Sequence, residues 1–262
     1  MKSIPFASKL LALVAAGTLL LGNVGSAAEI HVMSSGGFTA AYKELIPEFE
    51  RTTQHKVSTA YGASMGGAPD SIPSRLDRGE PADVIILAGT ALDQLISDGK
   101  AVDGSRVDLA RSTIGMAVRA GAPKPDISTV DAFKQALLDA ESIAYSASAS
   151  GKYLSEELFP RLGIADQIKE KSQRIESERV GTVVARGDAQ IGFQQVSELL
   201  PIEGIDYVGP LPDEIQKVTV FSAGIASNAK ETEAAAELIE FLSSAAAAPV
   251  ITKTGMEPVT AQ

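Results

Sequence analysis

Ser64 stands at the centre of a Gly-x-Ser-x-Gly pattern, residues 62–66, which marks the nucleophile of many serine hydrolases. A strand-like stretch precedes the pattern and a helix-compatible stretch follows it, as the motif requires. A nucleophilic serine also needs a general base, and in this motif the histidine follows the serine along the chain. The two histidines, His31 and His55, both precede Ser64. A secreted serine hydrolase therefore stays an alternative, and ligand binding is the favoured role of Ser64.

Two further stretches share the small, hydroxylated chemistry of the Ser64 turn. Residues 34–37 (SSGG), 62–67 (GASMGG) and 146–151 (SASASG) each connect a predicted strand to a predicted helix. At the carboxyl edge of a parallel sheet, helix N-termini present free N–H groups and the positive end of the helix dipole. Glycine lets the backbone approach a ligand closely, and serine adds a neutral donor. The stretches therefore predict a site for a small anion, although turn formation and helix capping favour the same residues.

Nucleotide, metal and thiol chemistry have little support in the sequence. Gly151 and Lys152 do not belong to a P-loop, because Ser146 stands where that motif has glycine and Tyr153 where it has serine or threonine. No aspartate cluster has the spacing of metal ligands, and the chain has no cysteine. We therefore expect no metal and no other cofactor.

The elements that must position these turns alternate between strand and helix periodicity. The predicted strands are residues 29–33, 56–61, 83–87, 113–118, 142–145, 188–194 and 218–223. The predicted helices are residues 38–49, 90–97, 130–138, 152–159, 181–185 and 231–242. Pro47 should bend or shorten the first of these helices. The order predicts an α/β protein with mainly parallel sheets flanked by helices.

The first 28 residues predict a cleaved secretory signal peptide. Lys2 and Lys9 precede an apolar run at residues 10–21, and small residues then predict cleavage after Ala28. The apolar run is shorter than the roughly 20 residues of a membrane-spanning helix, so we expect no membrane insertion after cleavage. The chain has 33 acidic and 23 basic residues, a net charge of −10, which disfavours nucleic acid as a partner.

From about residue 29 to 259 the chain resembles the periplasmic solute-binding proteins of ABC importers, in the branch of the molybdate-binding protein. The resemblance rests on the order and spacing of AAYKELIPEFERTTQHKV, RGEPADVIILAGTALDQLISDG, RGDAQIGF and AAAELIEFLSSAAAAPVITKTGMEPV. It implies a two-lobe fold with two hinge crossings, in which lobe closure encloses the ligand. Lobe one would comprise residues 29–112 and 218–262, and lobe two residues 113–217.

The resemblance also implies which residues bind the ligand. Molybdate binders hold the oxyanion with backbone N–H groups, two serines and a tyrosine; Ser64 matches one of these serines, and Ser150 matches a backbone N–H at a helix start. The other serine position is Gly37, which leaves residues 34 and 35 to supply a hydroxyl, and the tyrosine position is Gln195. The predicted ligand-binding residues are Ser34, Ser35, Gly37, Ser64, Met65, Ser148, Ser150, Gly151, Arg179 and Gln195.

These departures from the family pattern widen the range of expected ligands. The turn after Ser64 is also longer than in the pattern, and Arg179 lies near a family backbone N–H. An arginine in the cleft would favour a planar carboxylate, which accepts two hydrogen bonds from it. The other interpretation of Arg179 is an exposed partner of Glu176 or Glu178. The expected ligand is therefore a molybdate-type oxyanion or a small organic carboxylate.

We expect a periplasmic, monomeric binding protein that delivers this anion to the membrane permease of an ABC importer. No catalysed reaction is expected; the free energy that matters is the difference in ligand affinity between the closed and open states. A sensing module without transport is a further alternative.

Overall fold

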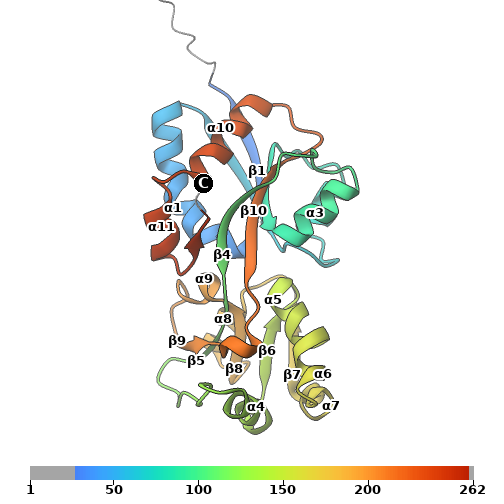
Figure 1. Ribbon diagram of the computed structural model, residues 1–262, viewed down its shortest axis with the longest axis vertical. Coiled ribbons are helices and arrows are strands. Elements are labelled where there is room, and N and C mark those ends of the chain that lie inside the picture. Colours follow the sequence, from blue (N-terminus) through green and yellow to red (C-terminus); the bar gives the residue numbers. More distant parts are fainter. Residues whose placement is uncertain (1–26, 260–262) are drawn as a thin grey trace, which may run out of the picture.

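The computed structural model describes residues 27–259, so nearly all of the predicted signal peptide lies outside the described residues. Figure 1 shows two lobes, one above the other, each built on its own sheet and joined by the chain that carries β4 and β10. This arrangement confirms the predicted two-lobe α/β fold. Within residues 27–259, every helix is too short or too polar to cross a bilayer.

The upper lobe in Figure 1 contains a six-stranded sheet with the order β11-β4-β10-β3-β1-β2. Its strands are β1 Glu29–Ser35, β2 Lys56–Gly62, β3 Val84–Ala88, β4 Val107–Ser112, β10 Thr219–Ile225 and β11 Glu257–Pro258. Its helices are α1 Gly36–Thr53, α2 Ile72–Asp77, α3 Gly89–Ser97, α10 Thr232–Ser243 and α11 Ala248–Lys253. Helices α1, α10 and α11 lie on one side of the sheet, and α3 lies on the other.

The lower lobe contains a five-stranded sheet with the order β7-β6-β8-β5-β9. Its strands are β5 Ile114–Arg119, β6 Ile143–Ser146, β7 Ser172–Ile175, β8 Ile191–Gln195 and β9 Ile205–Pro210. Its helices are α4 Val130–Asp139, α5 Ala149–Lys152, α6 Phe159–Arg161, α7 Ala165–Ile168, α8 Val180–Arg186 and α9 Val196–Leu199. A π-helical turn, Tyr153–Leu158, joins α5 to α6, and short 3₁₀ turns occupy Lys169–Lys171 and Asp213–Ile215.

Both sheets are mixed, where the sequence pattern predicts mainly parallel ones. In the upper sheet β1 runs parallel to β2 and β3, whereas β10 runs antiparallel to β3 and β4. In the lower sheet β6 runs parallel to β7 and β8, whereas β5 runs antiparallel to β8 and β9. In the upper sheet, the two connections between the lobes explain the antiparallel pair of β4 and β10. Strand β4 leads out of the upper lobe and β10 returns to it, so these neighbouring strands run in opposite directions.

Each lobe has its own apolar core. In the upper lobe, Phe38, Tyr42 and Phe49 of α1 are fully buried against the sheet and α10. In the lower lobe, the rings of Phe133 and Phe193 pack edge to face with centroids 5.8 Å apart. Because each lobe has its own apolar core, polar side chains can line the region between the lobes, together with a few apolar ones such as Ile175 and Phe221.

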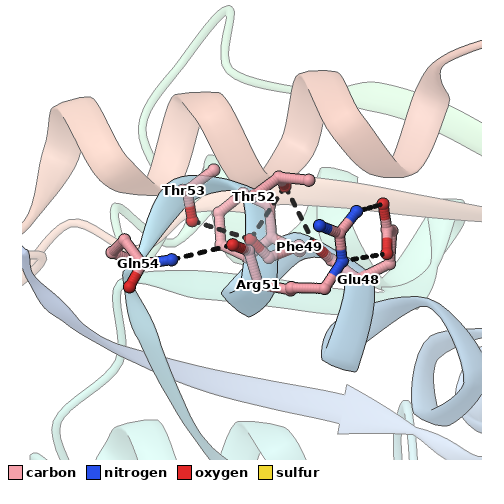
Figure 2. Close-up of polar contacts among 6 residues, drawn as sticks. All are labelled: Glu48, Phe49, Arg51, Thr52, Thr53 and Gln54. Atoms are coloured by element: carbon pink, nitrogen blue, oxygen red, sulfur yellow. Dashed lines mark hydrogen bonds and ion pairs between the residues drawn. The ribbon is translucent and has the colours of Figure 1, made fainter.

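Helix α1 continues through Pro47 and ends at Thr53, beyond the predicted end at residue 49. Figure 2 shows how it ends: the Thr53 hydroxyl donates to the carbonyl of Phe49 at 2.8 Å, and the Gln54 amide donates to the carbonyl of Arg51 at 2.8 Å. Gln54 has a φ of 65°, in the left-handed region that commonly stops a helix. The chain then enters β2, the strand that leads to Ser64.

Candidate functional site

A polar cleft of about 360 Å³ lies between the two lobes. The upper lobe lines it with the start of α1 and with β2 and the turn that follows. The lower lobe lines it with the turn after β6, the segment before α8, and the end of β8 with α9. The residues discussed below are Gly36, Gly37, Lys43, Tyr61, Ser64, Asp70, Ser148, Ser150, Glu176, Glu178, Arg179, Gln194, Gln195 and Glu198. All three predicted glycine- and serine-rich turns contribute to this one cleft.

Ser64 is buried at the wall of the cleft and is oriented by a backbone group. Its Oγ accepts a hydrogen bond from the N–H of Ala88 at 3.0 Å, which leaves the hydroxyl proton free to be donated. His31 and His55 are engaged elsewhere, with Asp83 and Glu237 respectively. In the described part of the chain, Ser64 therefore has no histidine base, and the geometry favours a donor over a nucleophile.

The turn after β6 presents serine side chains to the cleft from the lower lobe. Ser150 Oγ lies 3.1 Å from Ser146 Oγ, and Ser148 precedes α5 without using its side chain as a cap. Gly151 does not line the cleft. A Cβ at that position would lie 1.6 Å from the carbonyl oxygen of Ser146, so Gly151 is required by the close packing of the turn.

Ser34, Ser35 and Met65 are also absent from the cleft wall. Strand β1 extends to Ser35, two residues beyond the predicted end, so both serines still belong to the strand and are buried at 0% and 2% exposure. The glycines that begin α1 line the cleft in their place, and Met65 packs against the upper core. The helix start therefore contributes backbone and no serine hydroxyl.

Arg179 precedes α8 and lines the cleft. The predicted alternative partners are committed to other arginines: Glu176 to Arg174 at 3.2 Å and Glu178 to Arg186 at 2.7 Å. Among residues 27–259, no carboxylate lies within ion-pair distance of Arg179. Its guanidinium group is therefore available to a ligand.

Two glutamines at the end of β8 complete the lower wall. Gln195 donates from Nε2 to the hydroxyl of Thr219 at 2.9 Å, and its buried Oε1 has no partner among the described residues. Gln194 accepts from the N–H of Val180 at 2.9 Å and donates from Nε2 to Oε1 of Glu198 at 2.9 Å. Gln194 thus orients a carboxyl group that the sequence did not mark as a site residue.

Glu198 lies on α9 and borders the start of α1 in the opposite lobe. A Cβ on Gly36 would lie 2.0 Å from its Oε1, so the absence of a side chain at Gly36 makes room for this carboxyl group. Burial raises the pKa of Glu198 to about 7, although the charge of Arg179 and the hydrogen bond from Gln194 act in the opposite direction. Near neutral pH, both protonation states of this carboxyl group are populated.

The long turn after Ser64 reaches the other lobe. Asp70, near its end, accepts a hydrogen bond from the hydroxyl of Ser177 at 3.2 Å. Tyr61, at the end of β2, is 39% exposed, and Lys43 Nζ lies 5.0 Å from the centre of its ring. These residues form the outer wall of the cleft. No sequence motif marks these residues, but the position of Tyr61, three residues before Ser64, was a usable signal.

The family model for bacterial extracellular solute-binding proteins matches residues 30–257. The chain belongs to this family. Its relatives include an aconitate isomerase from Pseudomonas sp., 48% identical over 254 residues that cover 95% of this chain and 97% of the relative. The molybdate-binding protein ModA of Azotobacter vinelandii is 28% identical over 253 residues, covering 92% and 95%. Family membership confirms the resemblance predicted from the four sequence stretches.

Solved structures of a molybdate-binding and a sulfate-binding protein share the fold. The periplasmic molybdate-binding protein of Azotobacter vinelandii aligns with a TM-score of 0.70 and 22% identity, over 89% of this chain and 100% of that structure. The sulfate-binding protein SubI of Mycobacterium tuberculosis H37Rv aligns with a TM-score of 0.70 and 19% identity, over 88% and 87%. At this level of identity the comparison establishes the two-lobe architecture alone.

Proposed function

We propose that this solute-binding protein holds a small polycarboxylate between its lobes and isomerises aconitate. The observation that carries the proposal is the guanidinium group of Arg179, which lines the cleft and has no ion-pair partner among residues 27–259. A planar carboxylate accepts two parallel hydrogen bonds from arginine, whereas a tetrahedral oxyanion needs no such group when backbone and hydroxyl donors surround it. The identity of 48% with an aconitate isomerase, over nearly the full length of both chains, supports the same substrate.

The size and composition of the cleft fit a ligand of this class. Its volume of about 360 Å³ falls within the range of small-molecule sites. Aconitate carries three carboxylates on a short unsaturated chain, so it can use Arg179 from the lower lobe and the hydroxyl of Ser64 from the upper lobe together. A ligand held by both lobes favours the closed state, because only that state offers every contact.

The chemistry of aconitate suggests a proton shift. Its methylene group stands beside the double bond, so removing a proton from the methylene carbon and adding one to the former vinyl carbon moves the double bond by one position. Because the terminal carbons carry the same carboxylate substituent, the product is again aconitate, in either geometry. Addition of a thiolate, the other simple route to rotation about a double bond, is not open to this chain, which has no cysteine.

Capture of an anion for an ABC importer is the second candidate, and membership of the solute-binding family favours it. Transport needs only the closed and open lobes; isomerisation needs a group in the cleft that moves a proton. Conversion of aconitate by the purified protein therefore distinguishes isomerisation from transport.

The deciding experiment incubates the purified protein with trans-aconitate and follows the formation of the cis isomer by proton NMR. In parallel, a thermal-shift series compares aconitate, citrate, molybdate and sulfate. A ligand present at 100 times its dissociation constant stabilises the folded state by about 2.7 kcal/mol. We expect tricarboxylates to raise the melting temperature and trans-aconitate to be converted. Stabilisation by molybdate alone, or tricarboxylate binding without conversion, would contradict the proposal.

Ser148 offers a mild test of the cleft as the binding site. Its side chain lines the cleft without a capping role, so Ser148→Ala removes one neutral donor and leaves the fold intact. We expect aconitate affinity to fall about 2- to 10-fold, the net effect of one neutral hydrogen bond, in isothermal titration calorimetry. Ser64→Ala is a poorer probe, because it also removes the acceptor of the Ala88 N–H. Unchanged affinity in Ser148→Ala would place the ligand elsewhere.

A further inference from the structure

We propose that Glu198 is the catalytic residue that carries the proton between the two carbons of aconitate. This assignment rests on the proposed isomerase function and names the group that performs it.

The position of the Glu198 carboxyl group is fixed from both lobes. On its own lobe, Gln194 Nε2 donates to Oε1 at 2.9 Å. On the opposite lobe, the same oxygen lies against Gly36, where even a single added carbon would be 2.0 Å away. The carboxyl group therefore lies at the junction of the lobes, where a ligand enclosed by closure must pass close to it. A proton carrier has to be held in this way, because proton transfer needs hydrogen-bond distance to the reacting carbon.

The other carboxyl groups that line the cleft are bound to neighbours. Glu176 and Glu178 form ion pairs with Arg174 and Arg186, and Asp70 accepts a hydrogen bond from Ser177. Within residues 27–259, Glu198 has no ion-pair partner within 4.0 Å; its carboxyl group accepts from the neutral amide of Gln194 and lies beside the backbone of Gly36. Burial also penalises the negative charge of Glu198, which makes its carboxylate a stronger base than that of an exposed glutamate.

The remaining titratable groups that face Glu198 do not compete with it as a base. The guanidinium group of Arg179, before α8, has hydrogen-bond donors and no acceptor. Lys43 of α1 is exposed and its ammonium group lies over the ring of Tyr61. Burial raises the pKa of Tyr61, so the phenol keeps its proton near neutral pH. The cleft wall contains neither histidine nor cysteine. Glu198, with a pKa of about 7, can both accept and return a proton near neutral pH.

A single residue is sufficient for the removal and the return of the proton. The Glu198 carboxylate takes a proton from the methylene carbon; the C–H electron pair enters the conjugated system, and the negative charge is delocalised onto a substrate carboxylate beside Arg179. The carboxylic acid then returns the proton to the former vinyl carbon, where a new C–H bond forms. The double bond has moved, Glu198 is again a carboxylate, and no oxidant, reductant or second substrate is consumed.

Glu198→Gln tests the assignment, because the amide keeps the size of the side chain and loses its proton-transfer chemistry. We expect kcat for trans-aconitate to fall about 100- to 10,000-fold, while the dissociation constant from calorimetry changes by less than about 10-fold. Glu233→Gln, an exposed residue of α10, is the matched control and should keep wild-type kcat. In the wild type, kcat/KM should rise with pH through about 7 and then level, since the carboxylate is the reactive form.

Gly36→Ala is a second variant that keeps the carboxyl group but forces it to move. A loss of kcat in both variants, with binding retained, supports the assignment. If wild type isomerises aconitate and Glu198→Gln does so at a comparable rate, the assignment of Glu198 is wrong and the isomerase function stands. If wild type binds tricarboxylates and converts none of them, the proposed function itself fails.

Discussion

Replacing Arg179 by glutamine is expected to weaken aconitate binding by about 10- to 100-fold, the effect of losing a charge-assisted, two-point hydrogen bond to a carboxylate. The folded protein should be little affected, because Arg179 has no ion-pair partner among residues 27–259 whose charge would be left alone. Isothermal titration calorimetry measures the affinity, and the melting temperature without ligand measures the stability. Arg179→Gln should therefore lower the affinity for aconitate and leave the melting temperature of the ligand-free protein nearly unchanged.

Arg174→Gln is the matched control for Arg179→Gln. Arg174 lies on β7, is exposed, and pairs with Glu176 at 3.2 Å without lining the cleft. We expect its aconitate affinity to stay within about twofold of wild type, since an exposed ion pair contributes little free energy. Arg179→Lys should recover only part of the affinity, because an ammonium group cannot form the two-point contact. Equal losses in the Arg174 and Arg179 variants would show a general charge effect.

Arg179 also bears on the proposed proton carrier. Its charge lowers the pKa of Glu198 against the effect of burial. In Arg179→Gln the midpoint of the kcat/KM profile should therefore shift to higher pH. A carboxyl group with a merely structural role would leave this midpoint unchanged, so the profile links the two residues in one measurement.

The sequence predicted the elements whose residues are strongly apolar or strictly periodic. Strands such as Val84–Ala88 are buried on both faces, and their unbroken apolar run is visible without a structure. Four strands were missed: β4, β7, β9 and β11. Strand Ser172–Ile175 lies at a sheet edge, and Ile205–Pro210 lies at the other edge of the same sheet. Edge strands are half exposed, so their composition resembles that of a loop.

The candidate site was predictable where its residues have a distinctive local composition. The serine- and glycine-rich turns share one composition, which could be recognised in the sequence, and they do meet at one cleft. Glu198 has no such signature. Its position and its pKa depend on Gly36 in the other lobe and on Arg179 before α8, neither of which is a neighbour of Glu198 in the sequence. A chemical role that depends on lobe closure is not encoded in local spacing.

The departures from the molybdate pattern change the hydrogen-bonding groups in and around the cleft. Gly37 and Gln195 replace hydroxyl donors of that pattern, and in the structure Gln195 is bonded to Thr219 near the hinge. The longer turn after Ser64 brings Asp70 to Ser177, which places an acidic group at the cleft rim. Under the proposed function, these features and Arg179 suit a longer ligand with separated carboxylates better than a compact oxyanion.

Replacing Asp83 by alanine is expected to destabilise the upper lobe by about 3 kcal/mol, through loss of several hydrogen bonds to a buried carboxylate. Asp83 is 3% exposed and accepts from the backbone N–H groups of His31 at 2.7 Å, Lys230 at 2.7 Å and Glu231 at 3.0 Å. It thereby connects β1 to the start of α10. For a chain of this length the melting temperature should fall by roughly 6 to 12 °C, measured by circular dichroism.

The effect of Asp83→Ala should depend on pH in one direction. Burial opposes ionisation of Asp83, but hydrogen bonds from these backbone groups and the nearby His31 outweigh it and hold the pKa of the carboxyl below its ordinary value. A lowered folded-state pKa adds stability that is fully present above the unfolded-state pKa, near 4, and is lost as pH falls through the folded-state value. The difference in the free energy of unfolding between wild type and Asp83→Ala should therefore be constant from about pH 5 to 7 and shrink in stronger acid.

Asp103→Ala, in an exposed turn, is the matched control and should change stability by less than about 0.5 kcal/mol at any of these pH values. A difference that grows on acidification would mean that Asp83 is held in the folded protein as the neutral acid.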